Sequence, residues 1–212
     1  PINRVAYNQL SSLLTRGKRR TTKGQCELYH NDLIEHCADQ ILIALPPKKT
    51  NSAFVNYLKN LAKHAPGRCY LSANHSYGGD DCYNIAHITK IADSTNVPLV
   101  ATNDVHYHVP ERRALKDVLT CIRESCTIDQ AGFKLTANAE RHLKSPAEMI
   151  RLFESYPEAI AHTIEIADAC TFSLDDLQHQ YPEELAPDNL LPQDHLTHLT
   201  RQGAYERYSG NV

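Results

Sequence analysis

The chain has 212 residues, is 42% hydrophobic and carries a formal net charge of −3 at pH 7. This length suffices for one domain with its own core plus an appendage, and no apolar run approaches the roughly 20 residues that a membrane-spanning helix needs. The negative charge argues against a free-standing nucleic-acid-binding domain, while seven irregularly spaced cysteines without a Cys-x-x-Cys pair favour reduced thiols in the cytoplasm over a zinc ribbon.

Helix and strand periodicities alternate over the first two thirds of the chain. A first helix is expected near the N-terminus, and short apolar runs at 40–45, 69–73 and 97–102 predict buried strands. Between the strands, Ser52 can cap a helix, and a second helix presents Ile85, Ile88 and Ala92 on one face. Strands that recur with a helix between them predict an α/β fold with a parallel sheet, either open or closed into a barrel.

After residue 110 the pattern becomes mainly helical. Pro110 suits the first turn of a helix, and Ser145 with Pro146 and Glu148 forms a capping box at the start of another. Pro157 begins a further helical pattern. The acidic, proline-punctuated stretch 173–191 reads as a linker, and a last helix is expected from 193 to 208.

Polar side chains follow two of the predicted strands. His75 comes after the strand at 69–73, and Asp104 and His106 come after the strand at 97–102. Because the carboxyl ends of parallel strands share one face, these three side chains should converge, and their oxygen and nitrogen donors suit zinc or manganese. The alternative is that Asp104 caps its own loop and the histidines are incidental among twelve. His108 is a possible fourth ligand, or a turn residue before Pro110.

A basic run near the N-terminus offers possible phosphate contacts. It consists of Arg16, Lys18, Arg19 and Arg20. Such a run can bind the DNA backbone. It can equally be the solvated C-terminus of a helix, where cations favour the helix dipole. The sequence contains no glycine-rich phosphate loop and no nucleophile elbow, so nucleophilic catalysis has no positive support.

Several longer motifs resemble one protein family. Residues 100–113 (VATNDVHYHVPERR), 117–123 (DVLTCIR) and 139–146 (AERHLKSP) resemble the PHP domain of bacterial C-family DNA polymerases, the DNA polymerase III alpha subunits. Residues 108–113 (HVPERR) and 119–124 (LTCIRE), together with 14–20 (LTRGKRR), are similar to the error-prone branch of that family. The resemblance implies a distorted β/α barrel with metal ligands at the strand ends, here a partial one, and it assigns ligand positions to His75, Asp104 and His106.

The resemblance also implies a division of the chain. Residues 1–172 would be the later part of a PHP domain whose first strands and early ligands lie upstream, 173–191 a linker, and 192–212 a helix at the start of the polymerase region. The parent would be a DNA-directed DNA polymerase, a magnesium-dependent nucleotidyltransferase that acts in DNA replication and repair of damage. Its catalytic carboxylates would lie downstream, so this part alone is expected to be inactive, with a structural PHP domain that binds zinc or manganese weakly or not at all.

Partners and rival functions follow from the same resemblance. The parent would bind DNA, other damage-response polymerase subunits and the sliding clamp, and no membrane partner is expected. The truncated barrel could be completed by self-association. One rival is a free-standing PHP metal-dependent phosphoesterase, although the tail after residue 174 would have no role in one. The other is a non-enzymatic docking module.

Overall fold

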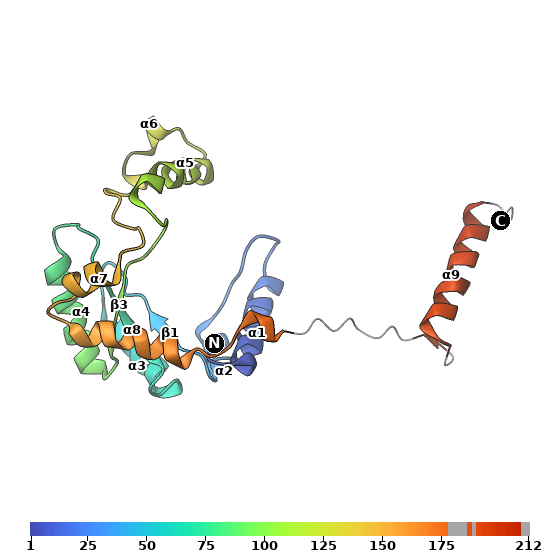
Figure 1. The fold of residues 1–212 in the computed structure, drawn as a ribbon, viewed down its shortest axis with the longest axis horizontal. Coiled ribbons are helices and arrows are strands. Elements are labelled where there is room, and N and C mark those ends of the chain that lie inside the picture. Colours follow the sequence, from blue (N-terminus) through green and yellow to red (C-terminus); the bar gives the residue numbers. More distant parts are fainter. Residues whose placement is uncertain (178–185, 188–189, 209–212) are drawn as a thin grey trace. The chain divides into compact units, whose positions relative to one another are not determined.

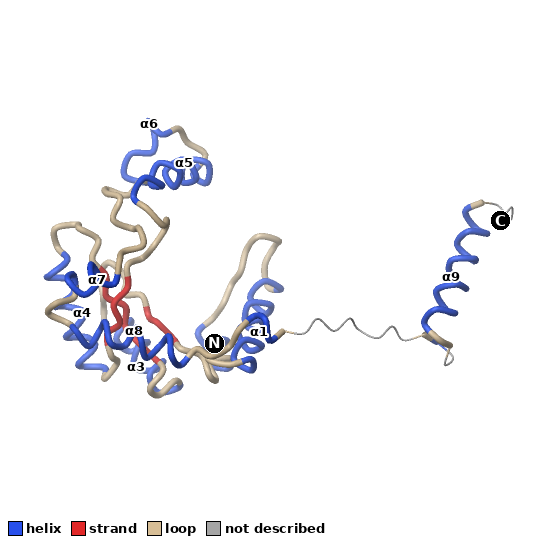
Figure 2. Tube along the Cα trace, in the orientation of Figure 1, coloured by secondary structure: helices blue, strands red, loops and turns tan. Residues whose placement is uncertain are grey.

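The computed structural model describes residues 1–177, 186–187 and 190–208. The contacts within it divide the chain into two units, Pro1–Phe172 and Ser173–Val212. The first unit is a mixed α/β structure built around a parallel sheet, and the second contains one long helix. The chain is drawn in Figure 1 and coloured by secondary structure in Figure 2.

The sheet has three parallel strands in the order β1-β2-β3 among the described residues. They are β1 (Leu42–Ala44), β2 (Cys69–Asn74) and β3 (Leu99–Thr102). β1 and β3 lie within runs predicted as strands, and β2 extends one residue beyond its predicted run, to Asn74. The parallel arrangement is confirmed by registers such as Leu71 opposite Leu99. The sheet is open, so the described strands do not form the barrel that the resemblance implies. β2, in the middle, is buried along almost its whole length because both of its edges and both of its faces are covered.

Two crossover helices connect the strands, α3 (Ser52–His64) and α4 (Asp81–Thr95). The predicted cap of α3 is one residue away from its true position: the side chain of Asn51, not Ser52, accepts the hydrogen bond from the backbone of Phe54. Asn51 has the extended backbone of an N-cap, and its amide oxygen is as good an acceptor as a serine hydroxyl. The apolar side chains predicted for α4, Ile85 and Ile88 among them, are buried as expected.

The core lies between these helices, the sheet and two later helices, α7 (Pro146–Leu152) and α8 (Pro157–Ala169). Leu58, Leu71 and Phe153 are almost completely buried in it. Half of the capping box predicted for α7 is confirmed, since Ser145 Oγ accepts from the backbone of Glu148 at 3.2 Å. The Glu148 carboxylate accepts from Arg151 and Tyr77 instead of from the backbone of Ser145. α8 lies against β3, where the His162 ring donates from Nδ1 to the carbonyl of Leu99 at 2.6 Å.

An excursion between β3 and α7 carries the 3-10 turns η1 (Pro110–Arg112) and η2 (Gly132–Lys134) and the helices α5 (Arg113–Glu124) and α6 (Ile128–Ala131). Pro110 therefore opens a 3-10 turn, and the α-helix itself begins at Arg113. Figure 2 shows two long loop segments leading to these helices. The apolar side chains of α5 face solvent, with Leu115, Leu119 and Ile122 all at least half exposed.

The remaining helices are α1 (Arg4–Arg19) and α2 (His30–Glu35) near the N-terminus, and η3 (Leu174–Asp176) and α9 (Pro192–Arg207) in the second unit. α9 confirms the helix predicted at 193–208. Of the predicted linker 173–191, residues 178–185 and 188–189 lie outside the described residues, and η3 lies within its described part. No helix in the described ranges has both the length and the apolar character needed to cross a membrane.

Candidate functional site

The carboxyl ends of β2 and β3 lie side by side, as the sequence predicts. Asn74 at the end of β2 is in register with Thr102 at the end of β3, and the hydroxyls of Ser72 and Thr102 are 2.6 Å apart. His75 follows β2 immediately, and Asp104 follows β3 by two residues with φ 43°, a left-handed backbone that is uncommon outside glycine and asparagine or aspartate. The candidate residues therefore leave the sheet from the same edge.

His75 contacts Asp81 and Phe153 and neither of the other two candidate ligands. Its Nδ1 lies 3.8 Å from Asp81 Oδ2 at the start of α4, and its ring meets Phe153 edge to face at a centroid distance of 5.2 Å. Asp81 also accepts hydrogen bonds from the backbone and the hydroxyl of Ser76. These contacts describe a mostly buried histidine that orders the loop after β2.

Asp104 and His106 form a separate group with an arginine. Asp104 Oδ1 lies 3.6 Å from His106 Nε2. Arg141 reaches both side chains, with Nη2 2.5 Å from Asp104 Oδ2 and Nη1 3.1 Å from His106 Nε2. All three are partly exposed. His108 is exposed.

These side chains do not fit a shared metal ion as they are arranged. A zinc site needs three or four protein ligands at about 2 Å from the ion. Within the described ranges, no three His, Cys, Asp or Glu side chains are grouped closely enough to hold one. The structure brings Asp104 and His106 together but leaves His75 with Asp81, so the three-ligand assignment stays a prediction from the resemblance.

The basic run lies at the C-terminal end of α1, where half of it is neutralised. Arg16 forms ion pairs with Asp32, at 3.2 Å, and with Glu35. Arg20 donates hydrogen bonds to the Asp32 carboxylate from both terminal nitrogens, one of them at 2.8 Å. The Asp32 carboxylate is buried, and these guanidinium donors together with the backbone N–H of Tyr29 hold its pKa well below its usual range. Arg16 and Arg20 thus hold α1 and α2 together.

The other two basic residues remain available to a ligand. Lys18 and Arg19 are exposed, and the part of the chain that the structure describes gives them no acidic partner. Arg19 lines an open groove of about 620 Å³ with Arg16, Arg20 and the hydroxyl residues Ser11, Ser12 and Thr15. Arginines beside hydroxyls are typical of contacts to phosphate oxygens.

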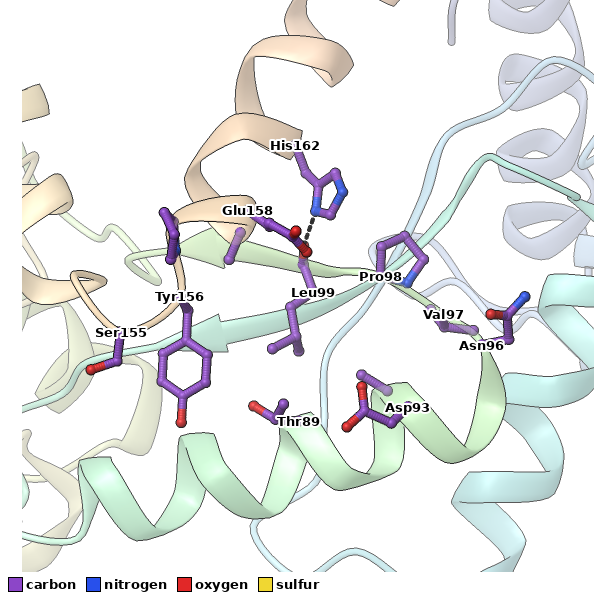
Figure 3. Close-up of a pocket in the computed structure, with 13 residues that line it drawn as sticks. Thr89, Asp93, Asn96, Val97, Pro98, Leu99, Ser155, Tyr156, Glu158 and His162 are labelled. Carbon is purple, nitrogen blue, oxygen red and sulfur yellow. Dashed lines mark hydrogen bonds between the residues drawn. The ribbon is translucent and has the colours of Figure 1, made fainter.

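Sequence reasoning missed a pocket of about 430 Å³ between α4, the start of β3 and α8. Figure 3 shows Thr89 and Asp93 on α4 facing Tyr156 and Leu99 across it. The pocket lies at the amino end of β3, whereas Asp104 follows the carboxyl end. No motif marks these residues, because they come together only through the packing of α8 on the sheet.

The buried Cys69 is poorly suited to act as a nucleophile. All seven cysteines are free, and four of them are buried or partly buried. Burial raises the pKa of Cys69 on β2 to about 11, which leaves its thiol protonated at neutral pH and therefore unreactive. Thiol catalysis has no support from this residue.

Comparison with known proteins identifies relatives for the whole chain, although no family model matches it. An error-prone DNA polymerase of Caulobacter vibrioides is 42% identical over 212 residues, which is all of this chain and 20% of the relative. Those of a Bradyrhizobium species and Brucella suis are 45% and 42% identical over 96% and 100% of this chain. The chain spans about one fifth of the length of these relatives. The resemblance to the error-prone branch is therefore confirmed: over its whole length, the chain is homologous to one segment of the error-prone DNA polymerases.

Proposed function

We propose that this chain forms the later part of a PHP domain in an error-prone DNA polymerase and that it supports the polymerase structurally. The observation that carries the proposal is similarity at 42–45% identity along the entire chain to proteins named as such polymerases. Residues 1–172 would be the PHP part, with the open parallel sheet belonging to a distorted barrel. Residues 173–191 would link it to a helix at 192–212 that begins the polymerase region.

The parent protein would add nucleotides to a primer on a DNA template in the cytoplasm, including templates that carry damage. That reaction is a metal-assisted phosphoryl transfer in which magnesium ions neutralise charge on the phosphates. We assign it to the four fifths of the parent that this chain does not match. The edge that carries Asp104 and His106 would contribute stability, because both side chains are already engaged by Arg141.

Primer extension tests whether nucleotide addition belongs to the part of the parent that this chain does not match. The purified chain, given magnesium, all four nucleotides and a primed template, should extend no primer, whereas the Caulobacter vibrioides relative should do so. Extension by the chain alone would contradict the proposal. Hydrolysis of p-nitrophenyl phosphate with zinc or manganese, lost on His106→Ala, would instead favour the free-standing phosphoesterase.

A second candidate role is docking of other polymerase subunits or the sliding clamp. The observation that favours it is the solvent-facing apolar side of α5, beside the fully exposed Phe133. Isolated apolar residues are common on surfaces, but a contiguous stripe usually marks a contact. A pull-down with those subunits should weaken on Leu119→Glu and not on Leu45→Glu, a still more exposed leucine directly after β1. Equal capture by both variants would remove this candidate.

A further inference from the structure

Arg141 holds the two side chains that the resemblance names as metal ligands. One guanidinium nitrogen lies 2.5 Å from Asp104 Oδ2 and the other lies 3.1 Å from His106 Nε2. A carboxylate oxygen and an imidazole nitrogen are the atoms that zinc would bind. Asp104 Oδ2 and His106 Nε2 both contact donors from this single cation, and the second carboxylate oxygen, Oδ1, lies 3.6 Å from His106 Nε2.

The guanidinium can only donate in its contacts with the two side chains. A guanidinium has five donors and no acceptor, so His106 Nε2 must be the acceptor of the bond from Arg141. The positive charge of Arg141 balances the negative charge of Asp104, so this ion pair carries no net charge that would attract a second cation.

Backbone pairing holds Arg141 in place. The N–H groups of His106 and Tyr107 both donate to the carbonyl of Arg141, at 2.9 and 3.3 Å. Leu143 returns a bond to the carbonyl of Tyr107 at 3.2 Å, and Tyr107 and His142 form a parallel bridge. The segment 141–143 therefore lies against 106–107 by main-chain contacts, and the guanidinium reaches Asp104 from a fixed base.

We propose that Arg141 is a built-in cation that takes the place of a metal ion at the carboxyl ends of the strands. It joins the loop after β3 to the segment before α7 and keeps divalent metal from Asp104 and His106. This inference rests on the proposed assignment of these two residues to the family's ligand positions. A metal ion would have to displace the guanidinium, and it would gain only two ligands, since His75 lies with Asp81.

The test measures zinc binding and melting of the whole 212-residue chain. After dialysis against zinc, the wild type should hold far less than one zinc per chain, and zinc should not raise its melting temperature. Arg141→Ala should bind zinc about 10-fold more tightly, because the competing cation is gone, and should melt about 1–3 °C lower without zinc. Arg141→Ala with His106→Ala should lose the gained zinc.

Two variants keep the test interpretable. Arg141→Lys retains the charge with fewer donors, so its zinc affinity should lie between those of the wild type and Arg141→Ala, and it serves if the alanine variant does not fold. Arg123→Ala removes a more exposed arginine of α5 and should change neither quantity.

Some outcomes would overturn the inference. Stoichiometric zinc in the wild type that His106→Ala abolishes would make these residues true ligands. Unchanged zinc affinity in both Arg141 variants would show that the guanidinium excludes nothing. All measurements use the chain without any polymerase assay, so their failure is distinct from failure of the proposed function.

Discussion

Neighbouring arginines lower the pKa values of individual carboxylates in this chain. Glu148 on α7 accepts from Arg151 at 2.9 and 2.7 Å and from the hydroxyl of Tyr77 at 3.2 Å. These hydrogen bonds lower the pKa of Glu148 from its ordinary 4.5 to about 2, and those from Arg151 are the largest cause. The same donors connect α7 to the loop after His75.

Stability should therefore depend on Glu148 below neutral pH. A carboxylate whose pKa is lowered in the folded state stabilises that state above about pH 4.5, and its contribution is lost as the pH falls towards about 2. Glu148→Gln cannot titrate, so the decline in urea midpoint between about pH 5 and about pH 3 should be shallower in this variant than in the wild type. Urea unfolding followed by circular dichroism at several pH values measures it.

The control for this experiment is Glu111→Gln, an exposed residue outside any described ion pair. It should leave the pH dependence unchanged. A Glu148→Gln curve parallel to that of the wild type would mean that the contacts of Glu148 with Arg151 contribute nothing in solution.

Helices and strands were predictable where short-range patterns decide them. The three strands, the cap at Ser145 and the helix at Pro157 follow from apolar periodicity and cap chemistry, which act within a few residues. The surroundings of α5 were not predictable, because a helical pattern does not say what will cover its apolar face. The same holds for barrel closure, which depends on pairing between strands distant in the chain.

At the end of α1, Arg16 and Arg20 are paired with Asp32, whereas Arg19 has no described acidic partner. This difference gives a prediction about DNA binding. Lys18→Ala and Arg19→Ala should each weaken binding of single-stranded DNA and reduce the steepness of its salt dependence by about 1. Arg20→Ala should instead lower the melting temperature, because it leaves the buried Asp32 with one guanidinium partner fewer. Fluorescence anisotropy at several salt concentrations, with parallel melting curves, measures both effects.

Lys63→Ala in α3 serves as the matched control, since this lysine lies away from the groove. Equal loss of DNA affinity in Lys63→Ala and Arg19→Ala would show only general charge attraction. If the wild-type chain binds no DNA at low salt, the groove has no part in DNA binding.

At the scale of the whole molecule, the sequence predicted which edge of the sheet carries the candidate site but not how its side chains are used. Residues 75, 104 and 106 leave the sheet together because parallel strands end together. Their partners could not be predicted: Arg141 lies 35 residues beyond His106, and only the pairing of two distant segments brings them into contact. The motifs were enough to identify the family, whereas the contacts of Arg141 with Asp104 and His106 could be seen only in the folded structure.

The central proposal is that this chain serves as a structural segment of an error-prone DNA polymerase, and a chimera tests it most directly. The matching 212 residues of the Caulobacter vibrioides relative would be replaced by this chain, and primer extension measured. We expect extension within a few-fold of the parent, retained in Asp104→Ala with His106→Ala, and lost in Leu71→Asp, which places a charge at a fully buried position of β2. A folded chimera that cannot extend a primer, or one that loses extension when Asp104 and His106 are replaced, would contradict the account.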